Sequence, residues 1–132
     1  NRHNNLAHLV YPKLGELYSK TSNYDKALEF YYKSLEAVPL RQMAQMQFKI
    51  ADTFQSKGES RNAIENYLKV TYLYSDEQDL TVKSLLRIAS IYEGDERFDE
   101  ALNAYKKIAS MDVKEAKYAM EKIDWITTER RK

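Results

Sequence analysis

The sequence predicts an all-α protein built from repeated helix pairs, and two observations indicate this class. The chain of 132 residues contains only three Gly and two Pro, whereas β-sandwiches and barrels need many turns. One pattern of small and aromatic residues also recurs three times with constant internal spacing, which is typical of helical arrays. A chain of this length suits one domain with a modest continuous core.

The repeated pattern consists of a five-residue segment that reads aliphatic, tiny, polar, variable, aromatic. Its three copies are residues 14–18, 50–54 and 88–92. An alanine follows each tiny residue by twelve positions, and a tyrosine follows each alanine by four. Two helices can approach closely at the tiny residues, and the aromatic groups one turn away fill the volume beside the contact. The pattern therefore predicts packed helix pairs.

The expected helices cover about residues 9–21, 24–37, 41–57, 60–74, 79–93, 97–110 and 113–130. Polar or Gly-containing segments at residues 20–23, 56–60 and 93–96 separate the members of each pair. Pro39 ends the second helix, because no helix continues through it. Pro12 predicts that the first helix begins or kinks at that residue.

The seventh helix has no partner and is expected to cap the array. Asp112 and Glu115 have the spacing of a capping box at its start. Its apolar stripe, expected to cover the last pair, consists of Ala116, Ala119, Met120, Ile123 and Ile126. Residues 129–132 place mostly positive charge at the C-terminal end, where the helix dipole favours it.

These residues resemble the tetratricopeptide repeat (TPR) family. The first unit matches the family consensus at Gly15, Tyr18, Ala27, Tyr31 and Pro39. The later units match it at Ala51, Phe54, Ala63 and Tyr67, and at Ala89, Tyr92, Ala101 and Tyr105, with Ser75 and Val113 in place of the closing proline. The resemblance covers roughly residues 8–113.

The resemblance implies a right-handed α-solenoid of three TPR helix pairs plus a C-terminal capping helix. It implies a single TPR domain over residues 1–132, with repeats at about 8–41, 44–78 and 82–113 and a cap at 113–131. The units are longer than the typical ~34 residues, and such stretched repeats resemble bacterial cell-envelope members, which implies a periplasmic or envelope location. The chain begins at Asn1 without Met, so we expect a fragment of a longer protein.

Composition and motifs argue against several classes of function. With 21 basic and 20 acidic residues the net charge is +1, so no nucleic-acid partner is expected. No apolar run approaches the ~18 residues of a membrane span. The chain has no Cys, and His3 and His8 lack the spacing of a helical metal pair. We find no catalytic constellation or phosphate loop and expect no enzymatic activity, metal or cofactor.

The functional surface implied by the resemblance is a concave groove lined mainly by the first helix of each pair. The corresponding groove positions are Leu9, Glu16, Lys20, Gln45, Phe48, Lys49, Asp52, Gln55, Lys83, Leu86, Arg87 and Ser90. Phe48 and Leu86 are interpreted as apolar anchors among charged residues. The competing interpretation is that they only pack against each other between adjacent helices.

Lys83 and Arg87 lie four residues apart and have the spacing to hold a carboxylate together. The alternative is that both are solvated or paired with neighbours such as Asp52. Some family members bind a chaperone's C-terminal carboxylate with a clamp that also needs a Lys and two Asn earlier in the chain. That clamp is not expected here, because Pro12, Glu16 and Asp52 stand at those places.

The sequence therefore predicts a non-catalytic scaffold that binds a partner protein segment, either an extended peptide or a helix. An RNA-binding helical repeat is the first alternative, because the chain has eleven tyrosines and aromatic side chains stack on unpaired bases. Most of these tyrosines fall at consensus core positions, which favours a packing role. The second alternative is a spacer within a longer solenoid.

Overall fold

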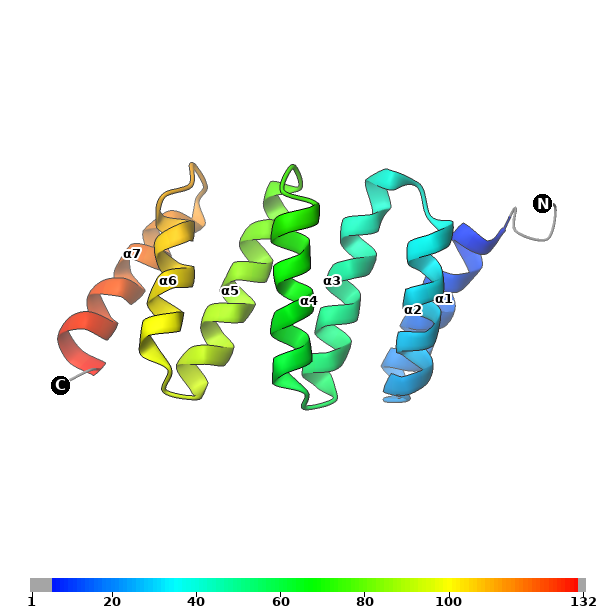
Figure 1. The fold of residues 1–132 in the computed structure, drawn as a ribbon, viewed down its shortest axis with the longest axis horizontal. Helices are drawn as coiled ribbons and strands as arrows, with labels where there is room; N and C mark the ends of the chain where they lie inside the picture. The colour runs from blue at the N-terminus through cyan, green and yellow to red at the C-terminus, as the bar shows by residue number, and fades with distance from the viewer. Residues whose placement is uncertain (1–5, 131–132) are drawn as a thin grey trace. The chain divides into compact units, whose positions relative to one another are not determined.

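The fold is seen in a computed structural model that describes residues 6–130 (Figure 1). Over that range it contains seven α-helices and no strand, which confirms the all-α, helical-repeat class. The helices are α1 (Ala7–Lys20), α2 (Tyr24–Ala37), α3 (Leu40–Ser56), α4 (Ser60–Leu73), α5 (Gln78–Gly94), α6 (Phe98–Ala109) and α7 (Glu115–Trp125). A short π-helical segment, Ile126–Arg130, continues α7. Each α-helix begins within two residues of its expected position.

The chain divides into two compact units between Glu77 and Gln78. Unit 1 contains α1 to α4, and unit 2 contains α5 to α7. In unit 1, α1 packs on α2, α2 on α3, and α3 on α4; in unit 2, α5 packs on α6 and α6 on α7 (Figure 1). Within each unit, every helix thus lies against its neighbour in the sequence, as the repeat predicts. A single continuous domain over residues 1–132 stays a prediction.

The turn inside each helix pair has the same backbone structure in all three repeats. Its central residue adopts a positive φ, at 61° for Ser22, 86° for Gly58 and 58° for Glu96. The amides of Asn23, Glu59 and Arg97 donate hydrogen bonds to the carbonyl oxygens of Tyr18, Phe54 and Tyr92, at 2.8, 2.9 and 2.8 Å. This geometry is that of a helix C-cap with a left-handed residue. The consensus aromatic therefore also supplies the carbonyl that closes the turn.

The small residues of the pattern lie at close helix contacts. A methyl group at Gly15 of α1 would lie 2.6 Å from ring carbons of Tyr31 in α2. The pattern alanines, Ala27, Ala51, Ala63, Ala89 and Ala101, are all 0% exposed. Because these residues are small and buried, they allow the paired helices to approach closely.

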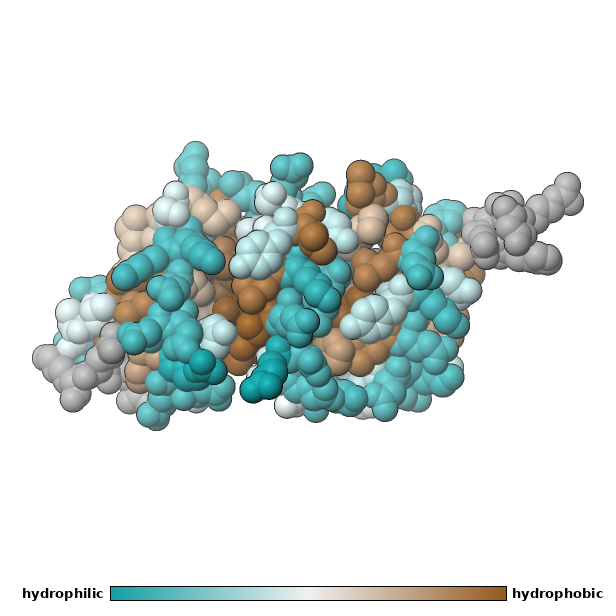
Figure 2. Space-filling model, viewed as in Figure 1, coloured by the Kyte–Doolittle hydropathy of each residue, from teal (hydrophilic) through white to brown (hydrophobic). Residues whose placement is uncertain are grey.

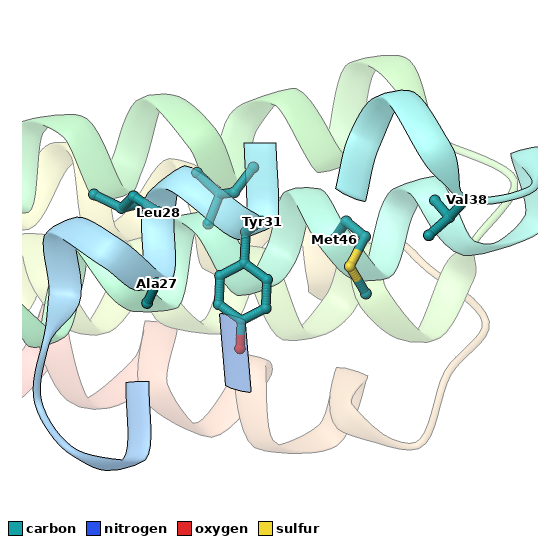
Figure 3. Close-up of a cluster of buried hydrophobic side chains, with 6 residues drawn as sticks. Ala27, Leu28, Tyr31, Val38 and Met46 are labelled. Atoms are coloured by element: carbon teal, nitrogen blue, oxygen red, sulfur yellow. The ribbon is translucent and has the colours of Figure 1, made fainter. Parts of the chain in front are cut away.

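The core of unit 1 continues from the first helix pair into the second. Ala27, Leu28, Tyr31 and Val38 from α2 and its C-terminus cluster with Met46 and Ile50 of α3 (Figure 3). On the face drawn in Figure 2, hydrophilic residues cover much of the surface and hydrophobic atoms are visible between them. Apolar burial of this kind is the main stabilising term for stacked helices.

A buried polar pair also joins α3 to α4, and the sequence analysis did not predict it. The Nε2 of Gln47 donates to the Oδ1 of Asn66 at 2.8 Å, and both side chains are buried. The Nδ2 of Asn66 in turn donates to the carbonyl of Asn62 at 2.8 Å. Because each buried amide has a partner, the pair avoids the free-energy cost of an unsatisfied polar group.

The structure shows that the first helix does not begin at Pro12, while a kink at that residue stays a prediction. Helix α1 begins at Ala7 and runs through Pro12 to Lys20. A proline inside a helix removes one hydrogen bond, here the one to the carbonyl of His8. The loss falls near the helix start, and the remaining turns of α1 pack on α2.

The structure partly corrects the description of the last helix. Helix α7 packs on α6, and Ala119 and Ile126 are fully buried, as a cap requires. Met120 is 55% exposed and does not belong to the covering stripe. Asp112 is not the N-cap, because α7 begins at Glu115 and no side chain caps it. Residues 131–132 of the expected basic end lie outside the described residues.

We expect Gly15→Ala to lower the free energy of unfolding by about 1–3 kcal/mol, because the added methyl group overpacks the contact with Tyr31. Alanine is otherwise favoured over glycine inside a helix by about 1 kcal/mol. The control is Gly94→Ala, since nothing lies within 4 Å of the added methyl group there. Chemical denaturation measures both variants. Equal stability of Gly15→Ala and the wild type would contradict the packing described for α1 and α2.

Ala63→Leu in α4 is expected to lower the free energy of unfolding by about 1–3 kcal/mol, because Ala63 is fully buried against its neighbours. Arg61→Leu places the same side chain at an exposed position of the same helix and serves as the control. Thermal melts compare the two. If both variants melted alike, Ala63 would not be a tight helix contact.

Candidate functional site

The expected groove residues of α1 and α3 form a charged surface on unit 1. The Nζ of Lys20 lies 3.5 Å from a carboxylate oxygen of Glu16, and the Nζ of Lys49 lies 3.9 Å from the other. Gln45 is exposed on α3. Exposed ion pairs of this kind stabilise a fold by at most about 1 kcal/mol, so their charges remain available to a ligand. We call Glu16, Lys20, Gln45, Lys49, Asp52 and Gln55 the unit 1 polar surface.

Two residues of the unit 1 polar surface are tied to the core by Tyr67 of α4. The Tyr67 hydroxyl donates a short hydrogen bond to a carboxylate oxygen of Asp52 and lies 2.6 Å from the side-chain oxygen of Gln55. The Tyr67 side chain is itself fully buried. Asp52 and Gln55 thus have a structural role beside any binding role.

Phe48 does not serve as an exposed anchor. Its side chain is only 5% exposed, and its ring lies 5.6 Å from that of Tyr67 at an interplanar angle of 58°. Phe48 is therefore a buried packing residue rather than an exposed anchor, and any part it plays in binding stays a prediction. The α3–α4 contact buries the ring because Tyr67 at the consensus position meets it.

The expected groove residues of α5 lie on unit 2. Lys83, Arg87 and Ser90 are exposed, and Leu86 is half-buried. Leu86 and Ser90 form one wall of an open cleft with a volume of about 770 Å³. This volume falls within the roughly 300–1,000 Å³ typical of ligand pockets. The cleft, called the unit 2 cleft below, is lined by Leu86, Ser90, Glu93, Gly94, Glu96, Tyr105, Tyr118, Lys122 and Trp125.

A polar cluster of three side chains lies inside the unit 2 cleft. The Tyr105 hydroxyl donates to one carboxylate oxygen of Glu93 at 2.8 Å, and the Lys122 Nζ donates to the other at 2.7 Å. The side chains of Lys122 and Glu93 are only 22% and 20% exposed. Burial and the adjacent Glu93 carboxylate hold the pKa of Tyr105 well above its usual value. The cluster thus keeps Tyr105 protonated as a donor.

Two aromatic rings lie near the Lys122 ammonium group. Its Nζ lies 4.6 Å from the ring centroid of Trp125 and 6.0 Å from that of Tyr105. Tyr118 packs edge-on against Tyr105, with ring centroids 6.3 Å apart. Trp125 and Tyr118 remain 41% and 50% exposed. The cleft therefore combines a carboxylate, a cation and accessible aromatic surface.

The sequence analysis did not assign seven residues of the unit 2 cleft to a binding site. It placed Glu93, Gly94 and Glu96 in a turn and Tyr105 in the core, and it did not single out Tyr118, Lys122 or Trp125. The three-residue spacing from Lys122 to Trp125, which places both on one helix face, was the available signal.

Neither metal nor membrane features are found in the described part of the chain. No group of three or more His, Cys, Asp and Glu side chains within residues 6–130 is placed to hold a metal ion. No described helix is both long and apolar enough to cross a bilayer.

The stacked helix pairs and their first-helix surfaces define a helical-repeat protein of the TPR type. A tetratricopeptide repeat family model matches residues 10–39, which cover most of α1 and all of α2. The chain belongs to the soluble NSF attachment protein family, whose model matches residues 35–123, more than half of the chain. No curated protein and no solved structure matches the chain. Repeats of this type generally mediate protein–protein interaction, and both families typically comprise non-catalytic scaffolds.

Alkaline pH is expected to destabilise unit 1 through Tyr31. Burial, with the nearby Glu16 and Asp52 carboxylates, raises the pKa of Tyr31 from 10.0 to about 12. Because the pKa is higher in the folded state, this contribution to stability is complete below pH 10 and is lost as the pH rises from 10 to 12.

Denaturation at a series of pH values measures this effect. Tyr31→Phe should show a smaller loss of stability above pH 10 than the wild type, since it cannot ionise. Tyr24→Phe, at the start of the same helix, is the control and should behave like the wild type. An unchanged alkaline dependence in Tyr31→Phe would show that other groups determine it.

Proposed function

We propose that the chain is a protein-interaction scaffold that binds a segment of a partner protein on the first-helix surfaces, without catalysis. The observation that carries this proposal is the unit 2 cleft, which is lined by Leu86 and Ser90 of α5 and by exposed aromatic rings of α7. Accessible aromatic groups with charged neighbours are typical of binding surfaces, in which a few anchors supply most of the affinity.

In this proposal the charged residues on α5 determine which partner binds. Lys83 and Arg87 lie one turn apart, and Leu86 beside them belongs to the cleft wall. Charged groups at the edge of an interface mainly affect association rate and specificity. The name of the family records attachment to another protein, NSF, which agrees with a scaffold role.

The RNA-binding alternative has less support. Tyr31, Tyr67 and Tyr105 are almost completely buried and unavailable for stacking on bases. The chain also lacks the excess positive charge that phosphate contacts require. The spacer alternative and the envelope location remain predictions.

A matched pair of charge-reversal variants tests the proposal. Lys83→Glu/Arg87→Glu changes two basic residues of α5, and Lys106→Glu/Lys107→Glu makes the same change at exposed positions of α6. Partner proteins are captured from a cell extract and quantified against the wild type, with thermal melts of every variant. We expect the α5 variant to lose a specific partner at an unchanged melting temperature, and the α6 variant to keep it.

Two results would contradict the proposal. Equal capture of the partner by both variants would show that the first-helix surface takes no part in the interaction. Binding of generic RNA with a steep dependence on salt concentration would favour the nucleic-acid alternative, because phosphate contacts release counterions.

A further inference from the structure

A second cleft lies at one end of unit 1, where α3 begins and α4 ends (Figure 1). Its volume is about 530 Å³, and it is lined by residues 39–41 and by residues 73, 74, 76 and 77. Leu40 and Leu73, one from each helix, are 78% and 65% exposed. Figure 2 shows hydrophobic atoms at the surface over this end of unit 1. Because exposed apolar groups gain free energy when they leave water, this cleft, called the unit 1 end cleft below, is suited to being covered by another molecule.

Charges of both signs line the unit 1 end cleft without pairing with one another. Arg41 lies at the start of α3, and Asp76 and Glu77 follow the end of α4. All three side chains are exposed, and none of them forms an ion pair or a hydrogen bond with another residue in the range 6–130. The cleft therefore presents a basic side, an acidic side and apolar groups from both helices.

The backbones of the two helices reinforce this separation of charge. A helix carries a partial positive charge at its start and a partial negative charge at its end. Arg41 lies at the positive end of α3, and Asp76 and Glu77 lie next to the negative end of α4. Each side chain thus stands where the dipole of its helix disfavours it. Opposite charges from a second molecule would relieve the repulsion on both sides of the cleft.

A surface with one basic side and one acidic side is complementary to a copy of itself related by a two-fold axis. In that arrangement the basic side of each copy faces the acidic side of the other, and the exposed leucines of the two copies meet. We propose that two copies of this chain dimerise through their unit 1 end clefts, with Arg41 of each copy paired to Asp76 and Glu77 of the other. The contact uses none of the residues proposed above to bind a partner, so the two proposals are tested separately.

Analytical ultracentrifugation of the wild-type protein at low salt tests this proposal. Two exposed leucines per copy make a small interface, so we expect a weak dimer, with a mass that rises towards twice that of the monomer between about 10 μM and 1 mM. Leu40→Gln/Leu73→Gln should weaken dimerisation at least about tenfold, because it removes the apolar groups. The control, Leu9→Gln/Leu17→Gln, makes the same changes at exposed leucines of α1 and should dimerise like the wild type.

Charge reversal tests the two-fold pairing itself. Arg41→Glu makes the charged groups of the cleft all acidic, and Asp76→Arg/Glu77→Arg makes them all basic. Each variant alone should dimerise about tenfold more weakly than the wild type, because like charges then face each other. An equimolar mixture of the two should associate as a 1:1 heterodimer, since both contacts again join opposite charges. Arg61→Glu, at an exposed position of α4, is the control for reversal of one arginine, and circular dichroism confirms that each variant is folded.

Several results would overturn the proposal. A wild type that stays monomeric at every concentration would do so, as would a mixture of the charge-reversed variants that associates no better than its components. Loss of dimerisation in Leu9→Gln/Leu17→Gln but not in Leu40→Gln/Leu73→Gln would place the contact on α1 instead. A monomeric wild type that captures a partner protein lost by Leu40→Gln/Leu73→Gln would assign the cleft to that protein. The α5 capture experiment decides the scaffold function independently of these results.

Discussion

The close approach of paired helices at tiny residues is the constraint on which the rest of the structure depends. Gly15 leaves no room for even one methyl group against the Tyr31 ring. The alanines at the corresponding positions of the later pairs are fully buried. Because interiors are packed to nearly crystalline density, these contacts fix the distance and register of each helix pair.

The consensus tyrosine connects this packing to the surface on which partners are proposed to bind. Tyr67 reaches Gln55, and Tyr105 reaches Glu93, each across twelve residues of sequence. In both cases the hydroxyl group of a buried ring forms a hydrogen bond with a polar side chain of the first helix of the pair. Tyrosine suits this position because one end of its side chain is apolar and the other forms hydrogen bonds. The register of the core therefore positions the polar groups at the surface.

The unit 2 cleft shows how the same contact organises a polar cluster. The Tyr105 hydroxyl donates a hydrogen bond to Glu93, and Lys122 of α7 donates another to the same carboxylate. The Lys122 ammonium group also lies near the ring of Trp125. A partly buried charge is costly unless it is paired and hydrogen-bonded, and this cluster satisfies both charges. The pair links α5 to α7.

The sequence by itself determined the helix pairs, the turns between them and the small and aromatic contact positions of this chain. These features follow from local periodicity and spacing, which are present in the order of the residues. Only the tertiary structure decided that Phe48 is buried by Tyr67, that α1 continues through Pro12, and that Lys122 meets Glu93. Glu93 and Lys122 are 29 residues apart in the sequence. Which side chains meet across two packed helices depends on their crossing and rotation, and no spacing within one helix specifies these.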